Sequence, residues 1–143
     1  MDCCGGGGLA LGTGGLAAGE VLVLDTVGEL TSVYARAAVA FVGGSLVPIG
    51  GHNVLEPAMA GRPVVFGPHV ANVRHAVEIL TACGAGRRIE TGAGLPGAVL
   101  EWLNNPETAS RCGEAGRLAL ASHRGSAERA LALIEAALEP AGR

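Results

Sequence analysis

A strand, a glycine-rich loop, a helix and a second strand decide the fold, in residues 38–69, which read AVAFVGGSLVPIGGHNVLEPAMAGRPVVFGPH. The apolar runs Ala38–Val42 and Pro63–Phe66 are short and continuous, which is typical of strands buried on both faces of a sheet. Between them, Asn53 predicts the cap of a helix and Gly61 the glycine that follows its end. Two strands joined by a helix in this way predict a parallel pair.

The same alternation continues on both sides of this unit. Upstream, Val21–Leu24 predicts a first buried strand, and Gly28–Arg36 a short helix after it. Downstream, Asn72–Cys83 predicts a helix with one apolar face, and Arg87–Glu90 an edge strand. Further helices are expected over residues 95–103, 106–122 and 126–138. The predicted fold is α/β, a Rossmann-like parallel sheet with helices on both faces.

Composition narrows the class of protein. The chain has 143 residues, of which 49% are hydrophobic, enough for one domain with a core. Its net charge of -3 predicts no binding of nucleic acid. No apolar run reaches the roughly 18 residues of a membrane span, so we expect a soluble, cytoplasmic chain. Residues 1–19 are glycine-rich without a period and are predicted to be disordered or aberrant, which leaves residues 20–143 as the ordered domain.

Glycines and polar residues gather in the loops after the predicted strands. Parallel strands end at one edge of a sheet, and such sheets bind ligands at that edge. The loop from Gly43 to Asn53 leads into a helix, and its glycines would let backbone amides approach an anion closely. A phosphate there is one interpretation. The other is that the glycines only turn the chain.

Two carboxylates accompany this loop. Glu56 fits a capping box with Asn53, and it also fits an acceptor of hydrogen bonds from a ribose hydroxyl pair, which is compatible with capping. Glu29 is either a solvated carboxylate in the first turn of a helix or part of a base pocket, because Gly28 before it leaves room for a flat ring. Both residues are therefore candidates for nucleotide binding.

The histidines and cysteines do not predict a metal site. His52 and His69 lie in neighbouring loops without a third histidine or a carboxylate at ligand spacing, so hydrogen bonding to a ligand, or a purely structural role in the loops, is favoured over metal binding. The four cysteines include no C-x-x-C pair and are expected to be free thiols. Neither a metal nor a cofactor is expected.

Taken together, the motifs resemble the C-terminal domain of the Kdo transferases, which transfer 3-deoxy-D-manno-octulosonate in lipopolysaccharide synthesis. The matching motifs are DTVGEL at 25–30, AFVGGSL at 40–46, GGHNVLEPA at 50–58 and GPHVAN at 67–72. The likeness extends over about residues 20–138. It implies the C-terminal half of a GT-B glycosyltransferase, in which two Rossmann-like domains face each other across the active site.

The resemblance also implies a binding site for the donor CMP-Kdo. The implied donor-binding residues are Val27, Gly28, Glu29, Ser45, Gly51, His52, Asn53, Glu56, His69 and Asn72. Residues 27–29 would line the cytidine pocket, residues 51–53 would approach the phosphate, and Glu56 would hold the ribose. No catalytic residue is expected in this chain, because the family's general base lies in its N-terminal domain.

The implied function is that of the donor-binding domain in a transferase that moves Kdo to a lipid A precursor at the cytoplasmic face of the inner membrane. The acceptor and the membrane would be contacted by an N-terminal domain that we expect to be missing, so transfer by the isolated chain is not expected. Two alternatives stay open. One is the C-terminal domain of another GT-B enzyme that uses a UDP-sugar, and the other is a stand-alone module that pairs with a separate N-terminal half.

Overall fold

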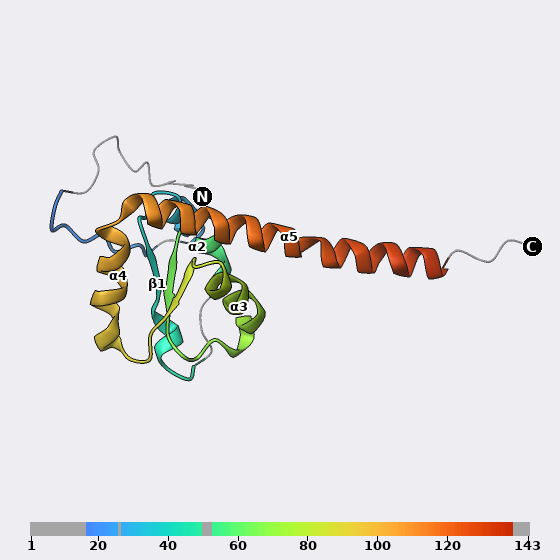
Figure 1. Ribbon diagram of the computed structural model, residues 1–143, viewed down its shortest axis with the longest axis horizontal. Coiled ribbons are helices and arrows are strands. Elements are labelled where there is room, and N and C mark those ends of the chain that lie inside the picture. Colours follow the sequence, from blue (N-terminus) through green and yellow to red (C-terminus); the bar gives the residue numbers. More distant parts are fainter. Residues whose placement is uncertain (1–16, 26, 50–52, 139–143) are drawn as a thin grey trace, which may run out of the picture.

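Three parallel strands form the sheet at the centre of the described chain: β1 (Ala40–Val42), β2 (Val64–Phe66) and β3 (Gly86–Arg88). The computed structural model describes residues 17–25, 27–49 and 53–138, the side chains of residues 124–138 excepted. The strands lie in the order β1-β2-β3, with β2 paired to both neighbours (Figure 1). The predicted parallel α/β sheet is confirmed.

Helices connect and cover these strands. The connecting helices are α1 (Leu30–Tyr34) before β1, α2 (Leu55–Met59) between β1 and β2, and α3 (Arg74–Ala82) between β2 and β3. After β3 come α4 (Leu95–Leu103) and α5 (Pro106–Leu138). Short 3-10 turns lie at η1 (Gly43–Leu46), η2 (Ala71–Val73) and η3 (Gly92–Gly94).

The side chains of β2 alternate between two cores, one on each face of the sheet. Val64 and Phe66 pack with Leu80 under α2, α3 and the first part of α5. Val65 points the other way and packs with Trp102 under α4. All three residues of β2 are fully buried, which explains why its sequence is apolar throughout rather than alternating. Figure 1 shows α3 and α4 on opposite sides of the strands.

Helix α2 begins and ends as the sequence predicts. The Asn53 Oδ1 accepts a hydrogen bond from the Leu55 backbone amide at 3.0 Å. Val54 already has helical dihedrals, φ -69° and ψ -13°, so Asn53 occupies the capping position. At the other end Gly61 has φ +72°, the left-handed conformation that favours glycine after a helix. Both predicted helix signals are confirmed.

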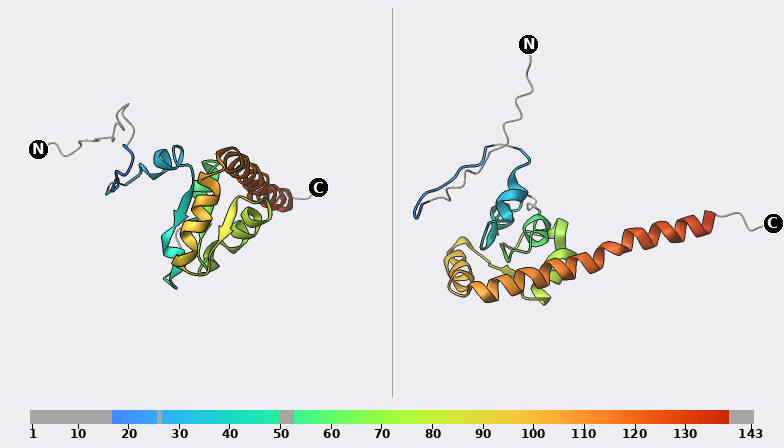
Figure 2. Two further views of the ribbon diagram at one scale, coloured as in Figure 1. Left: turned by 60° about the vertical axis from the view of Figure 1, so that its left-hand side comes forward. Right: turned by 90° about the horizontal axis from the view of Figure 1, so that it is seen from above.

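The strand predicted at Val21–Leu24 is wrong. These residues have no regular structure, and Val21 and Val23 are 87% and 80% exposed. Figure 2 shows residues 17–25, in blue, leading away from the sheet. A run of this kind becomes a buried strand only when a neighbour pairs with it and helices cover it, and the described helices cover β1, β2 and β3 instead.

The two helices predicted over residues 106–122 and 126–138 are a single helix, α5, of 33 residues. The expected break contains Gly125 but no proline, and a glycine in a helix costs only about 1 kcal/mol relative to alanine. Figures 1 and 2 show that only the first part of α5 covers the sheet, while the rest extends beyond it. Gly113 lets the first part of α5 approach Gly61 at the end of α2, since a Cβ on Gly113 would lie 2.0 Å from the Gly61 carbonyl oxygen. Despite its length, neither α5 nor any other described helix has the apolar stretch needed to cross a bilayer.

Candidate functional site

Two cavities open where the strands end. The α1 cavity, of about 250 Å³, lies among α1, the end of β1 and the start of α2, and is lined by Leu30, Tyr34, Phe41, Val42, Gly43, Asn53 and Glu56. The α3 cavity, of about 540 Å³, lies among the loops after β1 and β2, the first turns of α3 and the end of β3. Both therefore lie at the sheet edge at which the sequence predicts the site.

Ser45 ties the ends of β1 and β2 together. Its fully buried hydroxyl donates to the Val42 carbonyl and accepts a hydrogen bond from the Gly67 amide at 2.6 Å. Its own carbonyl accepts from the His69 amide at 2.9 Å. A Cβ on Gly67 would lie 2.4 Å from that carbonyl oxygen, so only glycine allows the approach. These bonds give Ser45 a positioning role. Its direct contact with a donor stays a prediction, and full burial of the side chain does not favour it.

The α1 cavity combines a carboxylate, an amide and aromatic walls. Glu56 and Asn53 enter it from α2, and Tyr34 enters it from α1. Burial raises the pKa of the Tyr34 phenol, and the negative charge of the Glu56 carboxylate raises it further. Phe41 and Leu30 form an apolar part of the cavity wall. A nucleoside needs this combination, with a flat apolar surface for the base and a carboxylate for the sugar hydroxyls.

Tyr34 is a candidate ligand-binding residue that the predicted site does not include. It lies four residues after Leu30, so both fall on one face of α1, and both line the α1 cavity. The sequence predicts a helix from Gly28 to Arg36, so this spacing is visible in the sequence. What it could not show is that this face points toward Glu56.

The structure describes all three residues predicted for the base pocket. Glu29 immediately precedes α1 and the cavity residue Leu30, and its carbonyl accepts hydrogen bonds from the amides of Ser32 and Val33 at 3.0 and 3.2 Å. Gly28 has φ +97°, a conformation that favours glycine. Val27 is fully exposed and is not part of the cavity wall. None of these three residues lines the α1 cavity, although Glu29 directly precedes the lining residue Leu30.

The predicted phosphate loop is described only at its ends. Gly51 and His52 lie outside the described residues, so their phosphate contacts stay a prediction. Before them, Pro48 lines the α3 cavity, and after them Asn53 lines the α1 cavity.

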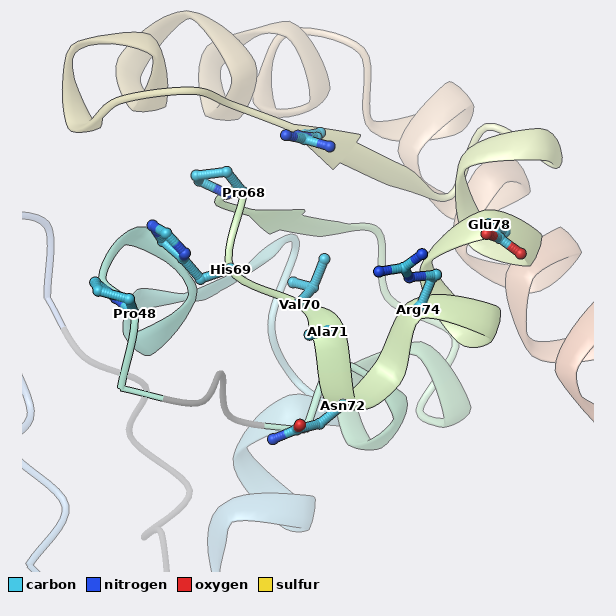
Figure 3. Close-up of a pocket in the computed structure, with 9 residues that line it drawn as sticks. Pro48, Pro68, His69, Val70, Ala71, Asn72, Arg74 and Glu78 are labelled. Carbon is cyan, nitrogen blue, oxygen red and sulfur yellow. The ribbon is translucent and has the colours of Figure 1, made fainter.

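His69 and Asn72 belong to the α3 cavity rather than to the α1 cavity (Figure 3). The structure adds two arginines to them, Arg74 from the first turn of α3 and Arg88 from the end of β3. Neither arginine belongs to the predicted set, because a charged residue at the surface of a helix or an edge strand carries no local signal of a site. The eight described residues of the predicted set thus do not line a single cavity. The described ones that line a cavity fall in two.

No metal site is visible in the described part of the chain, where no three His, Cys, Asp or Glu side chains come together. Cys83 and Cys112 are free thiols, as the sequence predicts for them. The prediction that no metal takes part stays a prediction.

A parallel α/β sheet with candidate cavities at the carboxyl ends of its strands defines a Rossmann-like ligand-binding domain. The structure is similar to the crystal structure of the C-terminal CMP-Kdo binding domain of WaaA from Acinetobacter baumannii. The TM-score is 0.62 and the sequence identity 34%, over 68% of this chain and 51% of that chain.

Curated relatives point to the same family. The 3-deoxy-D-manno-octulosonic acid transferases of Bordetella pertussis and Haemophilus influenzae are each 38% identical to this chain, over 81% and 84% of its length. The chain spans about a quarter of these relatives, 27% and 28%. No protein-family model matches the chain. The resemblance drawn from the motifs is confirmed: the chain is homologous to the C-terminal domain of the Kdo transferases, which are glycosyltransferases.

Proposed function

We propose that the chain is the donor-binding domain of a Kdo transferase and that it holds the nucleoside of CMP-Kdo in the α1 cavity. The observation that supports this most is the meeting of Asn53, Glu56 and Tyr34 at the carboxyl edge of the sheet, in a chain 34% identical to a CMP-Kdo binding domain. Three separate segments, in residues 30–34, 41–43 and 53–56, supply the walls of this cavity, as expected for a site rather than for a single turn.

Within this proposal each wall has a separate task. Glu56 accepts hydrogen bonds from the ribose hydroxyls, which suit a carboxylate. Tyr34 and Phe41 contact the flat base, and Glu29, just before α1, completes the base pocket. The backbone amides of Gly51, His52 and Asn53 approach the phosphate. When CMP departs from the sugar, hydrogen bonds from these amides stabilise its negative charge without a metal.

The transfer itself needs groups that we place outside this chain. We propose that the chain belongs to the C-terminal half of a GT-B enzyme, and that a second domain supplies the general base, the lipid A precursor site and the contact with the inner membrane. The isolated chain would then bind the donor but not transfer its sugar. Since the relatives are Kdo transferases, a UDP-sugar enzyme is not favoured.

Calorimetric titration of the 143-residue chain with CMP and with UDP tests the proposal. We expect binding of CMP in preference to UDP, and a loss of about tenfold in CMP affinity in Glu56→Gln, equivalent to about 1.4 kcal/mol. Glu107→Gln, at the exposed start of α5, is the matched control and should bind CMP like the parent. Preference for UDP, or equal CMP affinity in the parent and Glu56→Gln, would contradict the proposal.

A further inference from the structure

The α3 cavity carries positive charge that the proposed nucleoside site does not use. Its wall contains the guanidinium groups of Arg74 and Arg88, the imidazole of His69 and one carboxylate, Glu78. Two guanidinium charges against one carboxylate leave an excess of one positive charge, even with His69 neutral. A cavity of about 540 Å³ with this lining is suited to an anionic group on a larger ligand.

The register of β3 directs Arg88 into this cavity. Successive residues of a strand point to opposite faces of a sheet. Arg87 points toward α4, where its Nη2 lies 2.6 Å from the Glu101 Oε1 and its guanidinium lies 6.0 Å from the centre of the Trp102 ring. Arg88, paired in register with Phe66, lies on the face covered by α3. Two adjacent arginines therefore have different surroundings, and only Arg88 lines the cavity.

Both cavity arginines are available to a ligand. Arg88 contacts Glu90 at 3.1 Å, but both side chains are more than half exposed, and such a pair contributes about 1 kcal/mol at most. Arg74 forms no ion pair with another described residue. In Figure 3 its guanidinium points toward the space in front of Val70, and Glu78 lies farther along α3. A ligand carboxylate can thus bind these groups without breaking a buried interaction.

The α3 cavity lies on elements that adjoin those of the nucleoside site. Asn72 lines the α3 cavity, and it shares a further hollow with Leu55 at the start of α2. Asn53, two residues before Leu55, lines the α1 cavity. The hydrogen bonds of Ser45 to Gly67 and His69 join the end of β1, which lines the α1 cavity, to the loop after β2, which lines the α3 cavity.

We propose that Arg74 and Arg88 bind the carboxylate of the donor's sugar. This rests on the proposed function. The sugar of the relatives' reaction is an acid, so its CMP-linked form carries a carboxylate in addition to the phosphate. A planar guanidinium matches a carboxylate with two parallel hydrogen bonds. The α3 cavity is then the part of the site that distinguishes an acidic sugar from a neutral one.

The test compares two ligands on the whole chain. CMP carries the nucleoside and phosphate alone, whereas CMP-Kdo adds the acidic sugar. We expect the parent to bind CMP-Kdo at least about tenfold more tightly than CMP, which corresponds to 1.4 kcal/mol. The double variant Arg74→Gln, Arg88→Gln should lose this preference while its CMP affinity changes less than about twofold. Retained CMP binding also shows that the variant is folded.

Arg87→Gln is the matched control, since it removes the same charge from the opposite face of the same strand. It should keep the preference for CMP-Kdo. A double variant that still prefers CMP-Kdo as the parent does would overturn the inference. Equal loss of CMP and CMP-Kdo would overturn it as well, because the arginines would then hold the phosphate. If the parent binds no CMP, the proposed function fails and this inference fails with it, whereas the first two outcomes leave CMP binding by the parent intact.

Discussion

Two apolar runs of similar composition have opposite fates in this molecule. Val64–Phe66 forms the central strand and is fully buried, whereas Val21–Leu24 is largely exposed and forms no strand. The difference lies in their neighbours. β2 is paired on both edges and covered on both faces, while the earlier run lies away from the sheet. An apolar run thus predicts a capacity for burial, and packing decides whether that capacity is used.

Among the substitutions that test this contrast, Phe66→Ala should have the largest effect on stability. The ring is fully buried in the core under α2, α3 and α5, so its removal leaves a cavity that close-packed neighbours cannot fill. We expect a loss of about 3–5 kcal/mol in the free energy of unfolding, measured by urea denaturation. Phe66→Leu should lose clearly less, and a loss below about 1 kcal/mol in Phe66→Ala would mean that β2 is not the centre of the core.

Ser45→Ala should have the next largest effect. It leaves the Val42 carbonyl and the Gly67 amide without their buried partner. Leaving such groups unpaired costs about 1–3 kcal/mol, which urea denaturation would detect. Ser122→Ala, at an exposed hydroxyl that bonds only within α5 and to the neighbouring His123, is the control and should change stability little. Equal stability of the two variants would show that Ser45 does not join the strand ends.

Tyr34 lies in α1, between the largely exposed residues 17–25 and the first strand of the sheet. Its titration tests whether burial begins at α1. Tyr34 is the single tyrosine of the chain, so the absorbance of tyrosinate reports on it alone. Burial and then Glu56 raise its pKa above the ordinary value. In Glu56→Gln the pKa should fall part of the way and stay raised, because burial is the larger cause. An unchanged pKa in that variant would place Glu56 away from Tyr34.

The raised pKa of Tyr34 also predicts how the stability of the protein changes with pH. A group whose pKa is higher in the folded state favours folding below its unfolded pKa, about 10, and this contribution is lost as the pH rises through the folded pKa. Stability should therefore decline as the pH rises above about 10, and less so in Tyr34→Phe, which cannot titrate.

Val23→Ser should have the smallest effect. The side chain is 80% exposed, and exposed substitutions usually change the free energy of unfolding by less than about 0.5 kcal/mol. Urea denaturation of the variant would measure this. A loss above about 1 kcal/mol would mean that the run is buried in solution, and the contrast with β2 would then disappear.

Much of the fold and part of the site could be predicted from the sequence. The strands at β1 and β2 and both ends of α2 follow from local rules, since the cap at Asn53 and the left-handed Gly61 act within a few residues. Asn53 and Glu56 do lie together in a cavity at the predicted edge. Arg88 could not be found in this way, because the direction of its side chain depends on the pairing of β3 with Phe66.

By itself the sequence determined the alternation of strands and helices from β1 to β3, the capped start of α2 and the edge of the sheet at which the candidate residues gather. Only the tertiary structure decided that Val21–Leu24 stays outside the sheet, that α5 is one helix, and that the candidate residues line two cavities rather than one. The physical reason is range. Caps, turns and periodicity act between near neighbours in the chain, whereas pairing, burial and the shape of a cavity depend on segments that are distant in sequence.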